Sequence, residues 1–290
     1  MGTLRGRSAI ITGASQGLGL EITKYYIDAG ANVLICARDV EVLRRAADDL
    51  MPRLRVDQKF ISVGADVSKE QDATKVVSRA LVEFGDLHVL VNNAGIYGPK
   101  GFAEEVDWSA WKQAIDVNLF GSVLMARAIL PYFKSKKRGK IIQISGGGAT
   151  APLPYLSSYA ASKAAIVRFV ETLAEEVKEY SIDVNSVAPG ALNTRLLDEV
   201  IGAGPLKVGE KFYKRALEQK STGGVPLAYG AELAVFLCSE ASNKITGRLI
   251  SAVWDDWSSW PNHVGDLENS DVFTLRRITG KDRNMEWGDK

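Results

Sequence analysis

The chain has little cysteine, no long hydrophobic run and almost no net charge, and each of these absences excludes a class of protein. Its two cysteines, Cys36 and Cys238, stand in short apolar runs, so we expect both to be buried rather than joined in a disulfide. No apolar run approaches the roughly 20 residues that a membrane span needs. The apolar run 8–11 is too short for a signal peptide. We therefore expect a cytoplasmic protein with no membrane partner.

The charge pattern gives no sign of a nucleic-acid partner. The formal net charge is +1, and lysine and arginine are spread along the chain rather than gathered into a basic face. The one basic run, 134–138, precedes an apolar segment and is typical of a solvated helix end. We also predict no metal site.

Short apolar runs alternate with longer segments of helical period along the first two thirds of the 290 residues. The runs predict strands at 9–11, 32–36, 60–63, 87–91, 140–144 and 182–187. The periodic segments predict helices at 18–29, 40–50, 69–84, 108–134 and 158–180, with the fourth interrupted at Gly121 and ended near Pro131. Continuously apolar strands are expected where helices cover both faces of a parallel sheet. The fold class predicted is α/β, a doubly wound parallel sheet of Rossmann type in three α/β/α layers.

One domain accounts for most of the chain. We place it at residues 1–254, with a lid over the substrate at about 195–224, and assign 255–290 to a C-terminal extension. Trp254, Trp257 and Trp260 stand where the extension begins. They are expected to cap the substrate pocket, to bind a neighbouring subunit, or to pack on the chain's own core.

A glycine-rich turn joins the first predicted strand to the first helix. In the run Thr12-Gly-Ala-Ser-Gln-Gly-Leu-Gly19, Gly13 permits a tight turn, Gly17 allows the backbone to approach a diphosphate, and Gly19 allows close helix–strand packing. The helix N-terminus then presents free N–H groups to the phosphates. The residues predicted to contact a dinucleotide here are Gly13, Ser15, Gln16, Gly17, Leu18 and Gly19.

The end of the second strand determines which dinucleotide is preferred. An acid there holds the ribose hydroxyls of NAD, whereas an arginine accommodates the 2′-phosphate of NADP. The sequence Cys36-Ala-Arg-Asp39 places Ala37 at the acid position and Arg38 next to it. This favours NADP(H) over NAD(H). Asp39 would be the ribose ligand if the alignment were shifted by two residues.

Five motifs in a fixed order support a family resemblance. They are the glycine turn 12–19, Asp66-Val67, Asn92-Asn-Ala-Gly95, Tyr159-x-x-x-Lys163, and Pro189-Gly190 with Thr194. With them, residues 7–250 resemble the short-chain dehydrogenase/reductase family in its single-domain form. The Gly-x-x-x-Gly-x-Gly spacing differs from the Gly-x-x-Gly-x-x-Gly of the related sugar-nucleotide epimerases.

The resemblance implies a role for each matching residue. Asn92 would help to stabilise the central sheet, and Asn118 would anchor a water in a proton relay. The residues implied to bind the cofactor are Asp66 and Val67 at the adenine, Asn93, Ala94 and Gly95 beside the sheet, and Pro189, Gly190 and Thr194 at the nicotinamide end. The resemblance also implies a homo-oligomer, a dimer or tetramer packed through the helix that carries Tyr159.

Tyr159 and Lys163 stand four residues apart on a predicted helix, so they share one face. A phenol has an ordinary pKa near ~10 and is a poor base at neutral pH. A nearby ammonium, together with an oxidised nicotinamide, is expected to lower the pKa of Tyr159 toward the working pH. Lys163 is also expected to bind the nicotinamide ribose and, like Tyr159, to contact the cofactor.

The sequence departs from the family pattern where a serine normally polarises the substrate carbonyl. That position is Gly146, and the nearest serine is Ser145. The glycines 146–148 permit unusual backbone angles, so Ser145 is one candidate for the missing donor. A water, the substrate itself or a backbone N–H of the glycine run are the others. Ser145 could equally do no more than end its strand.

The activity predicted is hydride transfer between NADP(H) and a ketone or secondary alcohol, with Tyr159 as general acid or base. The alternatives are a non-catalytic NADP sensor and a dehydratase or epimerase acting on a sugar-type substrate. Tyr97 and Tyr155 are candidate pocket residues by position. The small-molecule substrate stays open between a sugar and a 3-oxoacyl thioester. The basic lid residues Arg195, Lys207, Lys211, Lys214 and Arg215 are expected to be solvated more readily than to meet a substrate anion.

Overall fold

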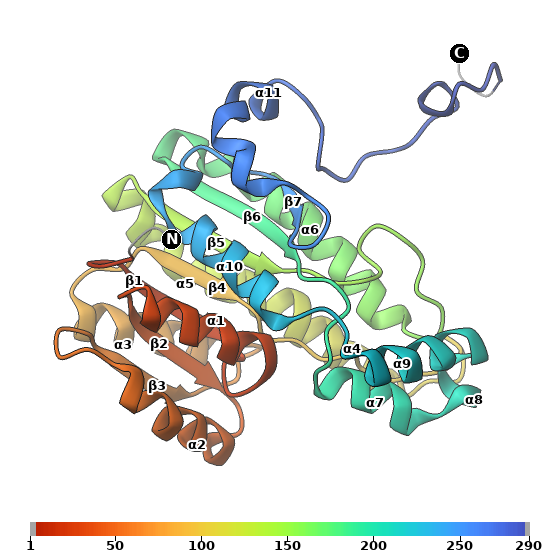
Figure 1. The fold of residues 1–290 in the computed structure, drawn as a ribbon, viewed down its shortest axis with the longest axis horizontal. Helices are drawn as coiled ribbons and strands as arrows, with labels where there is room; N and C mark the ends of the chain where they lie inside the picture. Colours follow the sequence, from red (N-terminus) through yellow and green to blue (C-terminus); the bar gives the residue numbers. More distant parts are fainter. Residues whose placement is uncertain (1–3, 288–290) are drawn as a thin grey trace.

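A computed structural model describes residues 4–287, so the first three residues of the predicted domain and the last three of the predicted extension lie outside it. Its centre is one seven-stranded sheet in the order β3-β2-β1-β4-β5-β6-β7 (Figure 1). Every pair of neighbouring strands is parallel. The strands are β1 (Ser8–Thr12), β2 (Asn32–Ala37), β3 (Phe60–Gly64), β4 (Val89–Asn92), β5 (Gly139–Ile144), β6 (Ile182–Ala188) and β7 (Leu249–Ser251).

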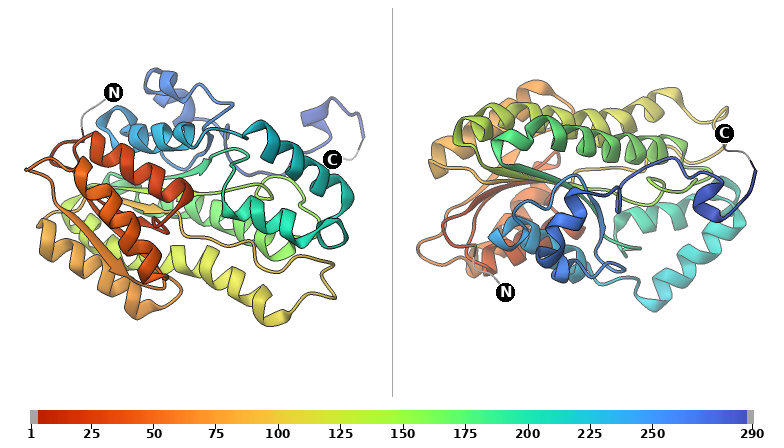
Figure 2. Two further views of the ribbon diagram at one scale, coloured as in Figure 1. Left: turned by 60° about the horizontal axis from the view of Figure 1, so that its bottom comes forward. Right: turned by 90° about the horizontal axis from the view of Figure 1, so that it is seen from above.

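Helices cover both faces of the sheet, which confirms the three-layer α/β/α prediction (Figure 2). One hydrophobic core joins the sheet to α1 (Gly17–Asp28), α2 (Val40–Leu50) and α10 (Leu227–Cys238). A second core joins the opposite face to α3 (Glu70–Phe84), α5 (Gly121–Lys136) and α6 (Ser157–Val177). Because the central strands are buried between two helical layers, most of their residues are apolar. Cys36 and Cys238 are both buried and free, as predicted.

The order of the strands locates the site. Successive strands are added outward from β1 to β3 on one side, and the chain then crosses to β4 on the other side of β1. At such a reversal the loops after the two central strands diverge and leave a crevice at the carboxyl ends of the strands. The glycine turn follows β1, and the segment Asn92–Gly95 continues from the end of β4. Both motifs therefore meet at this crevice.

The long helical segment after β4 differs from our prediction. It comprises α4 (Trp108–Ile115), a π-helical turn (Asp116–Phe120) and α5, and it does not end near Pro131. Pro131 lies inside α5 on its exposed side. A proline in a helix interior costs about 3 kcal/mol, but the buried Ile129 and Phe133 on either side pack into the core and keep the helix continuous.

The same segment, Trp108–Lys136, is long and apolar enough to cross a membrane by length and composition. About 44% of its most apolar window is buried. Its buried side chains, including Met125, Ile129 and Phe133, pack in the core between α3 and the sheet. A core helix of this kind passes the same test of length and composition, so the finding is weak evidence for a membrane span.

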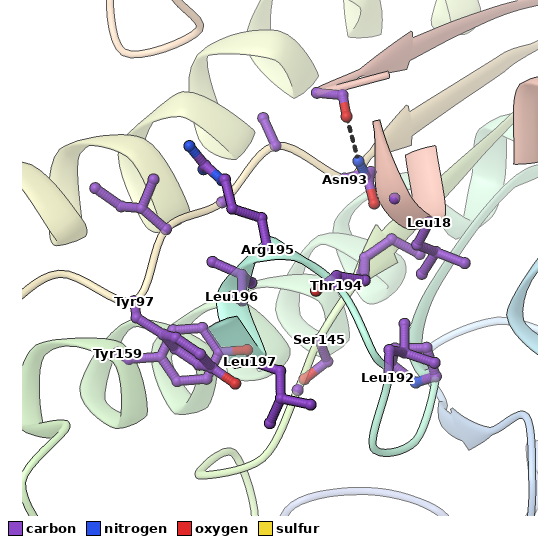
Figure 3. A pocket seen from close by; sticks show the side chains of 18 of the residues that line it. Leu18, Asn93, Tyr97, Ser145, Tyr159, Leu192, Thr194, Arg195, Leu196 and Leu197 are labelled. Atoms are coloured by element: carbon purple, nitrogen blue, oxygen red, sulfur yellow. Dashed lines mark hydrogen bonds between the residues drawn. The ribbon is translucent and has the colours of Figure 1, made fainter. Parts of the chain in front are cut away.

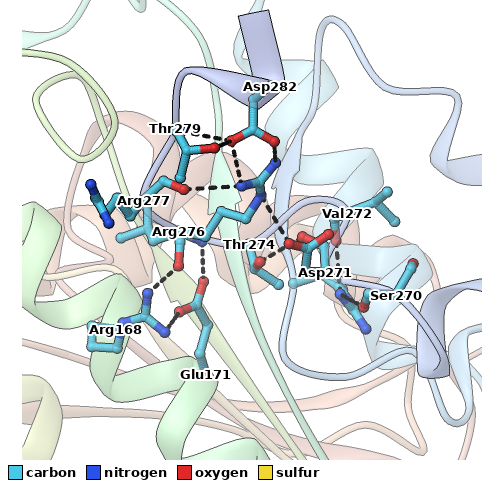
Figure 4. Close-up of polar contacts among 12 residues, drawn as sticks. Arg168, Glu171, Ser270, Asp271, Val272, Thr274, Arg276, Arg277, Thr279 and Asp282 are labelled. Atoms are coloured by element: carbon cyan, nitrogen blue, oxygen red, sulfur yellow. Dashed lines mark hydrogen bonds and ion pairs between the residues drawn. The ribbon is translucent and has the colours of Figure 1, made fainter. Parts of the chain in front are cut away.

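Beyond β7 the chain forms a short 3-10 helix (Trp257–His263) and α11 (Val264–Glu268), then runs across β7 and α6. Buried Arg248 holds this stretch by donating to the carbonyls of Leu267, Ser270 and Val272. Farther along, Leu275 exchanges hydrogen bonds with two side chains of α6 (Figure 4). The last described residues then extend away from the body of the domain (Figure 1).

Two other helices and a third short one form a separate group at the edge of the crevice. They are α7 (Arg195–Ala203), α8 (Pro205–Val208) and α9 (Glu210–Thr222). A small apolar cluster of Leu197, Val200, Val208 and Ala216 holds them together. The predicted lid segment thus consists of three packed helices that follow β6 directly.

Candidate active site

The crevice contains a cavity of about 1180 Å³ at the carboxyl ends of the strands (Figure 3). The glycine turn borders one end, and Tyr159 and the lid helices border the other. Most residues predicted to bind a cofactor line it, namely Gly13, Ser15, Gln16, Gly17, Leu18, Arg38, Val67, Asn93, Ala94, Gly95, Tyr159, Lys163, Pro189, Gly190 and Thr194. Three predicted site residues are not among its lining: Gly19, Asp66 and Asn118.

The glycines of the turn are required by close approach of backbone. Gly13 has a φ of +63°, and a Cβ there would lie 2.7 Å from the Cα of Ala94. Gly17, which begins α1, has a φ of +57°, a conformation that other residues rarely adopt. A Cβ on Gly19 would overlap the side-chain amide of Asn93. Gly19 therefore acts by letting the turn pack against the neighbouring strand end rather than by facing the cavity.

Asn93 and Thr12 connect the two central loops. The Asn93 amide donates to the carbonyls of Thr12 and Gly13 at 3.0 and 2.9 Å, and Figure 3 draws one of these two bonds. In return, the Thr12 hydroxyl accepts from the backbone N–H groups of Asn93 and Ala94. Asn92 is buried and donates to the carbonyl of Ser122 on α5. These bonds hold the floor of the cavity in one geometry.

Arg38 and Asp39 both line the cavity where β2 ends. One carboxylate oxygen of Asp39 accepts from the N–H groups of Glu41 and Val42, so Asp39 is the N-cap of α2. A capping side chain is directed at its own helix. Within residues 4–287 the Arg38 side chain makes no hydrogen bond or ion pair, so it is free to face a ligand.

Asp66 and Val67 have different surroundings. An oxygen of Asp66 accepts from the N–H and the hydroxyl of Ser68, which turns the carboxylate toward its own loop. Val67 is buried at the cavity wall, and a Cβ on Gly121 would lie 2.7 Å from its side chain. Val67 therefore lines the cavity at this wall, whereas the Asp66 side chain does not.

Tyr159 and Lys163 are buried on one face of α6 at the far end of the cavity. The Lys163 amine donates to the Ile144 carbonyl at 2.9 Å and lies 5.5 Å from the centre of the Tyr159 ring. Burial lowers the pKa of Lys163 to about 8. Burial, with a smaller effect from Tyr97, raises the pKa of Tyr159 well above its ordinary value. In the protein by itself burial thus sets the pKa of Tyr159, and the lowering expected from Lys163 together with an oxidised nicotinamide stays a prediction.

Asn118 lies in the π-helical turn and connects three elements. Its amide donates to the Ile96 carbonyl and to the Ser162 hydroxyl, both at 2.9 Å, and its oxygen accepts from the Ile96 N–H. Ser162 in turn donates to the Tyr159 carbonyl. Both amide hydrogens of Asn118 and one acceptor position of its oxygen are thus used within the protein, and the side chain positions the loop after β4 against the helix that carries Tyr159 and Lys163.

Ser145 and Gly146 follow β5 at the same end of the cavity. The Ser145 hydroxyl is buried and has no hydrogen-bond partner among the described residues. A Cβ on Gly146 would overlap the phenol oxygen of Tyr159. The position where a serine is expected is therefore filled by the hydroxyl of the tyrosine.

The predicted nicotinamide end is the segment after β6. Gly190 has a φ of +90°, and a Cβ there would lie 2.9 Å from Val253, so only glycine fits this turn. Pro189 and Thr194 border the cavity on either side of it. Thr194 precedes α7 and caps it without a side-chain hydrogen bond. Its hydroxyl is therefore not committed to the helix.

The lid supplies an apolar wall that the sequence did not single out. Leu196, Leu197 and Phe212 of the lid line the cavity, together with Leu153 from the loop between β5 and α6. Their spacing resembles that of any amphipathic helix, so no motif marks them. Of the five basic lid residues, only Arg195 lines the cavity, and its side chain pairs with Glu199 at 3.6 Å.

The tyrosines and tryptophans proposed as pocket residues lie in different surroundings. Tyr97 lines the cavity, whereas Tyr155 stacks on Phe102 outside it. Trp254 also borders the cavity and is 86% exposed. The other two tryptophans pack on the chain itself, Trp257 against Phe236 and Trp260 against Phe273.

A family model described as short chain dehydrogenase matches residues 7–202. Among curated proteins, glucose 1-dehydrogenase 2 of Bacillus subtilis is 32% identical over 85% of this chain and 93% of its own length. L-fucose dehydrogenase of Bos taurus is 31% identical over 83% of this chain and 87% of its own length.

Several solved structures are also similar to this chain. A 3-ketoacyl-(acyl-carrier-protein) reductase from Brucella melitensis, complexed with NADH, has a TM-score of 0.73 and 32% identity, covering 86% of this chain and 97% of that one. A 7α-hydroxysteroid dehydrogenase complexed with NADH and 7-oxo glycochenodeoxycholic acid has a TM-score of 0.75 and 28% identity, covering 86% and 93%. An NAD+-bound xylitol dehydrogenase, at 21% identity and a TM-score of 0.77, shares the fold over 85% of this chain and 97% of that one.

Proposed function

The chain belongs to the short-chain dehydrogenase family and is an NAD(P)-dependent oxidoreductase, and from this premise we propose that it exchanges a hydride between NADP(H) and a ketone or secondary alcohol. The observation that carries the proposal is the placement of Tyr159 and Lys163 at one end of a single cavity whose other end is the glycine turn. A dinucleotide bound in this way would present its reactive ring to the tyrosine.

The residues present fit a dinucleotide. The glycine turn forms a cradle that side chains would fill, and α1 begins there without a side-chain cap, so its first N–H groups are available to a diphosphate. Arg38 would hold the 2′-phosphate, since the Asp39 carboxylate caps α2. Lys163 would bind the ribose next to the nicotinamide, with Pro189, Gly190 and Thr194 around the ring.

When bound, the nicotinamide supplies or accepts the hydride. Tyr159 gives or takes the proton at its phenol oxygen. The raised pKa of Tyr159 keeps it protonated in the protein by itself, which suits a proton donor in the direction of reduction. For oxidation, a positive charge beside the phenol is needed to lower this pKa. Asn118 supports the transfer by fixing the loop after β4 against α6.

The substrate is a small molecule, and we propose that it enters from the lid side. The cytoplasmic location and the dimeric or tetrameric assembly stay predictions from the sequence.

The test is turnover with a panel of aldoses, cyclic secondary alcohols and 3-oxoacyl thioesters, each with NADP(H) and with NAD(H). We expect Tyr159→Phe to lower kcat by at least ~10²-fold, the usual contribution of a positioned acid or base, with the Kd for NADPH unchanged. Tyr155→Phe removes the same atom outside the cavity and serves as control. Full activity of Tyr159→Phe on a substrate of the wild type would contradict the mechanism.

A further inference from the structure

Position 146 lacks the hydroxyl that would polarise a carbonyl, yet another hydroxyl is close by. Tyr97 stands two residues after Gly95, on the loop that follows β4, and lines the same end of the cavity as Tyr159 and Ser145. Its ring meets that of Tyr159 edge-on, with 4.6 Å between ring centres and 75° between planes. Two phenols are thus placed side by side where one carbonyl oxygen would bind.

The two phenol groups reach the reacting end together. Figure 3 shows the rings of Tyr97 and Tyr159 side by side, with Ser145 lying beyond their hydroxyl ends. The phenol oxygen of Tyr159 lies against Gly146, because a Cβ on that glycine would overlap it. A carbonyl oxygen that accepts from Tyr159 would therefore also lie near the hydroxyl of Tyr97.

The surroundings of the two phenols differ in charge. Lys163 lies near the Tyr159 ring and has no carboxylate at ion-pair distance among residues 4–287. Lys100 lies at a similar distance, 5.8 Å, from the centre of the Tyr97 ring, but it pairs with Glu199 at 3.3 Å. Burial, with a further effect from the negative charge of Glu199, raises the pKa of Tyr97. Tyr97 therefore keeps its proton and can donate it in a hydrogen bond.

Tyr97 is held in place by the lid. Its ring packs on the apolar cluster of α7, α8 and α9, which includes Leu197 and Val200. A donor fixed before the substrate arrives costs no reorganisation during the reaction, which is the condition under which such donors contribute most. The lid thus orients a hydroxyl of the loop after β4, besides covering the substrate.

We propose that the Tyr97 hydroxyl donates the hydrogen bond to the substrate oxygen that the missing serine would otherwise supply, while Tyr159 transfers the proton. The inference rests on the proposed oxidoreductase function of the same site. In reduction, the substrate oxygen gains negative charge as the hydride reaches its carbon, Tyr159 delivers the proton to that oxygen, and Tyr97 keeps its own. Ser145 is the competing donor. Its buried, unpartnered hydroxyl lines the same end of the cavity, so the experiment must decide between the two hydroxyls.

The experiment compares Tyr97→Phe, Ser145→Ala and the control Tyr155→Phe on the substrate that the wild type turns over fastest in the panel above. We expect Tyr97→Phe to lower kcat by about 10²-fold or more, as loss of one oxyanion donor does. KM and the Kd for NADPH should change little. Tyr155→Phe should match the wild type.

Each other outcome overturns the inference. Wild-type kcat in Tyr97→Phe with a large loss in Ser145→Ala assigns the donor to Ser145. A loss in Tyr97→Phe that appears only in KM or in cofactor binding assigns Tyr97 to packing. If the wild type oxidises NADPH with a ketone and Tyr97→Phe does so equally well, the inference fails while the proposed function stands. If the wild type turns over no member of the panel, the proposed function fails and the inference falls with it.

Discussion

The phenol oxygen of Tyr159 occupies the space that a side chain on Gly146 would need. In the sequence, Gly146 stands at the position where the family normally has a serine. In the folded protein it is also the reason that the tyrosine hydroxyl can lie against the chain just after β5. The glycine and the tyrosine are thirteen residues apart in the chain. They meet because the loop after β5 and the start of α6 border the same end of the cavity.

The first prediction concerns this pair. Gly146→Ala should lower kcat by about 10²-fold, because the added methyl displaces the Tyr159 oxygen and a 1 Å error in the position of a reacting group costs roughly that much. Steady-state kinetics on the best panel substrate measures the effect. Gly147→Ala is the matched control, since a Cβ there meets nothing within 4 Å. Equal activity of the two variants would show that the tyrosine does not act from this position.

The second prediction concerns cofactor choice. Arg38→Ala should weaken NADPH by about 10- to 100-fold, the value of one or two charge-assisted hydrogen bonds, and leave NADH nearly unchanged. Fluorescence titration with both cofactors measures the two Kd values. Asp39→Ala should instead lower stability by about 1 kcal/mol, since it removes the N-cap of α2, with no change in the ratio of the two Kd values. A shift of preference in Asp39→Ala, and none in Arg38→Ala, would assign the ribose to the aspartate.

The third prediction concerns pH and stability. Burial lowers the pKa of Lys163 to about 8 from an ordinary 10.5. Below pH 8 the amine is protonated in both states, and its desolvation costs stability. Between pH 8 and 10.5 the folded protein has released a proton that the unfolded chain still binds, so stability rises with pH in this window. Lys163→Met lacks this dependence.

Urea denaturation of the wild type and of Lys163→Met at several pH values measures this pH dependence of stability. As pH rises from 8 to 10.5, the free energy of unfolding of the wild type should increase relative to that of Lys163→Met by about 3 kcal/mol at most. This amount is the free-energy equivalent of the lowered pKa of Lys163. Other titrating groups cancel in the difference between the two proteins. Lys178→Met, at an exposed position beyond α6, should differ from the wild type by a constant amount. A constant difference for Lys163→Met as well would mean that the amine keeps its ordinary pKa.

Local pattern predicted much of the fold because the relevant forces act over a few residues. Continuous apolar runs such as 32–36 indicated strands buried on both faces, and the parallel sheet has them there. Pro131 shows where local rules end. Its effect on the helix depended on the packing of Ile129 and Phe133 against strands that are distant in the sequence. A short stretch of sequence around Pro131 does not reveal that packing.

For the site, the sequence alone predicted which residues would carry the chemistry. The glycine turn, Tyr159 and Lys163 are recognisable because backbone approach and helical spacing demand those residue types at those intervals. Tertiary structure alone decided which of two tyrosines, Tyr97 or Tyr155, faces the cavity. It also decided that the pKa of Tyr159 is raised in the protein by itself, because desolvation depends on every atom packed around a group and not on its neighbours in the chain.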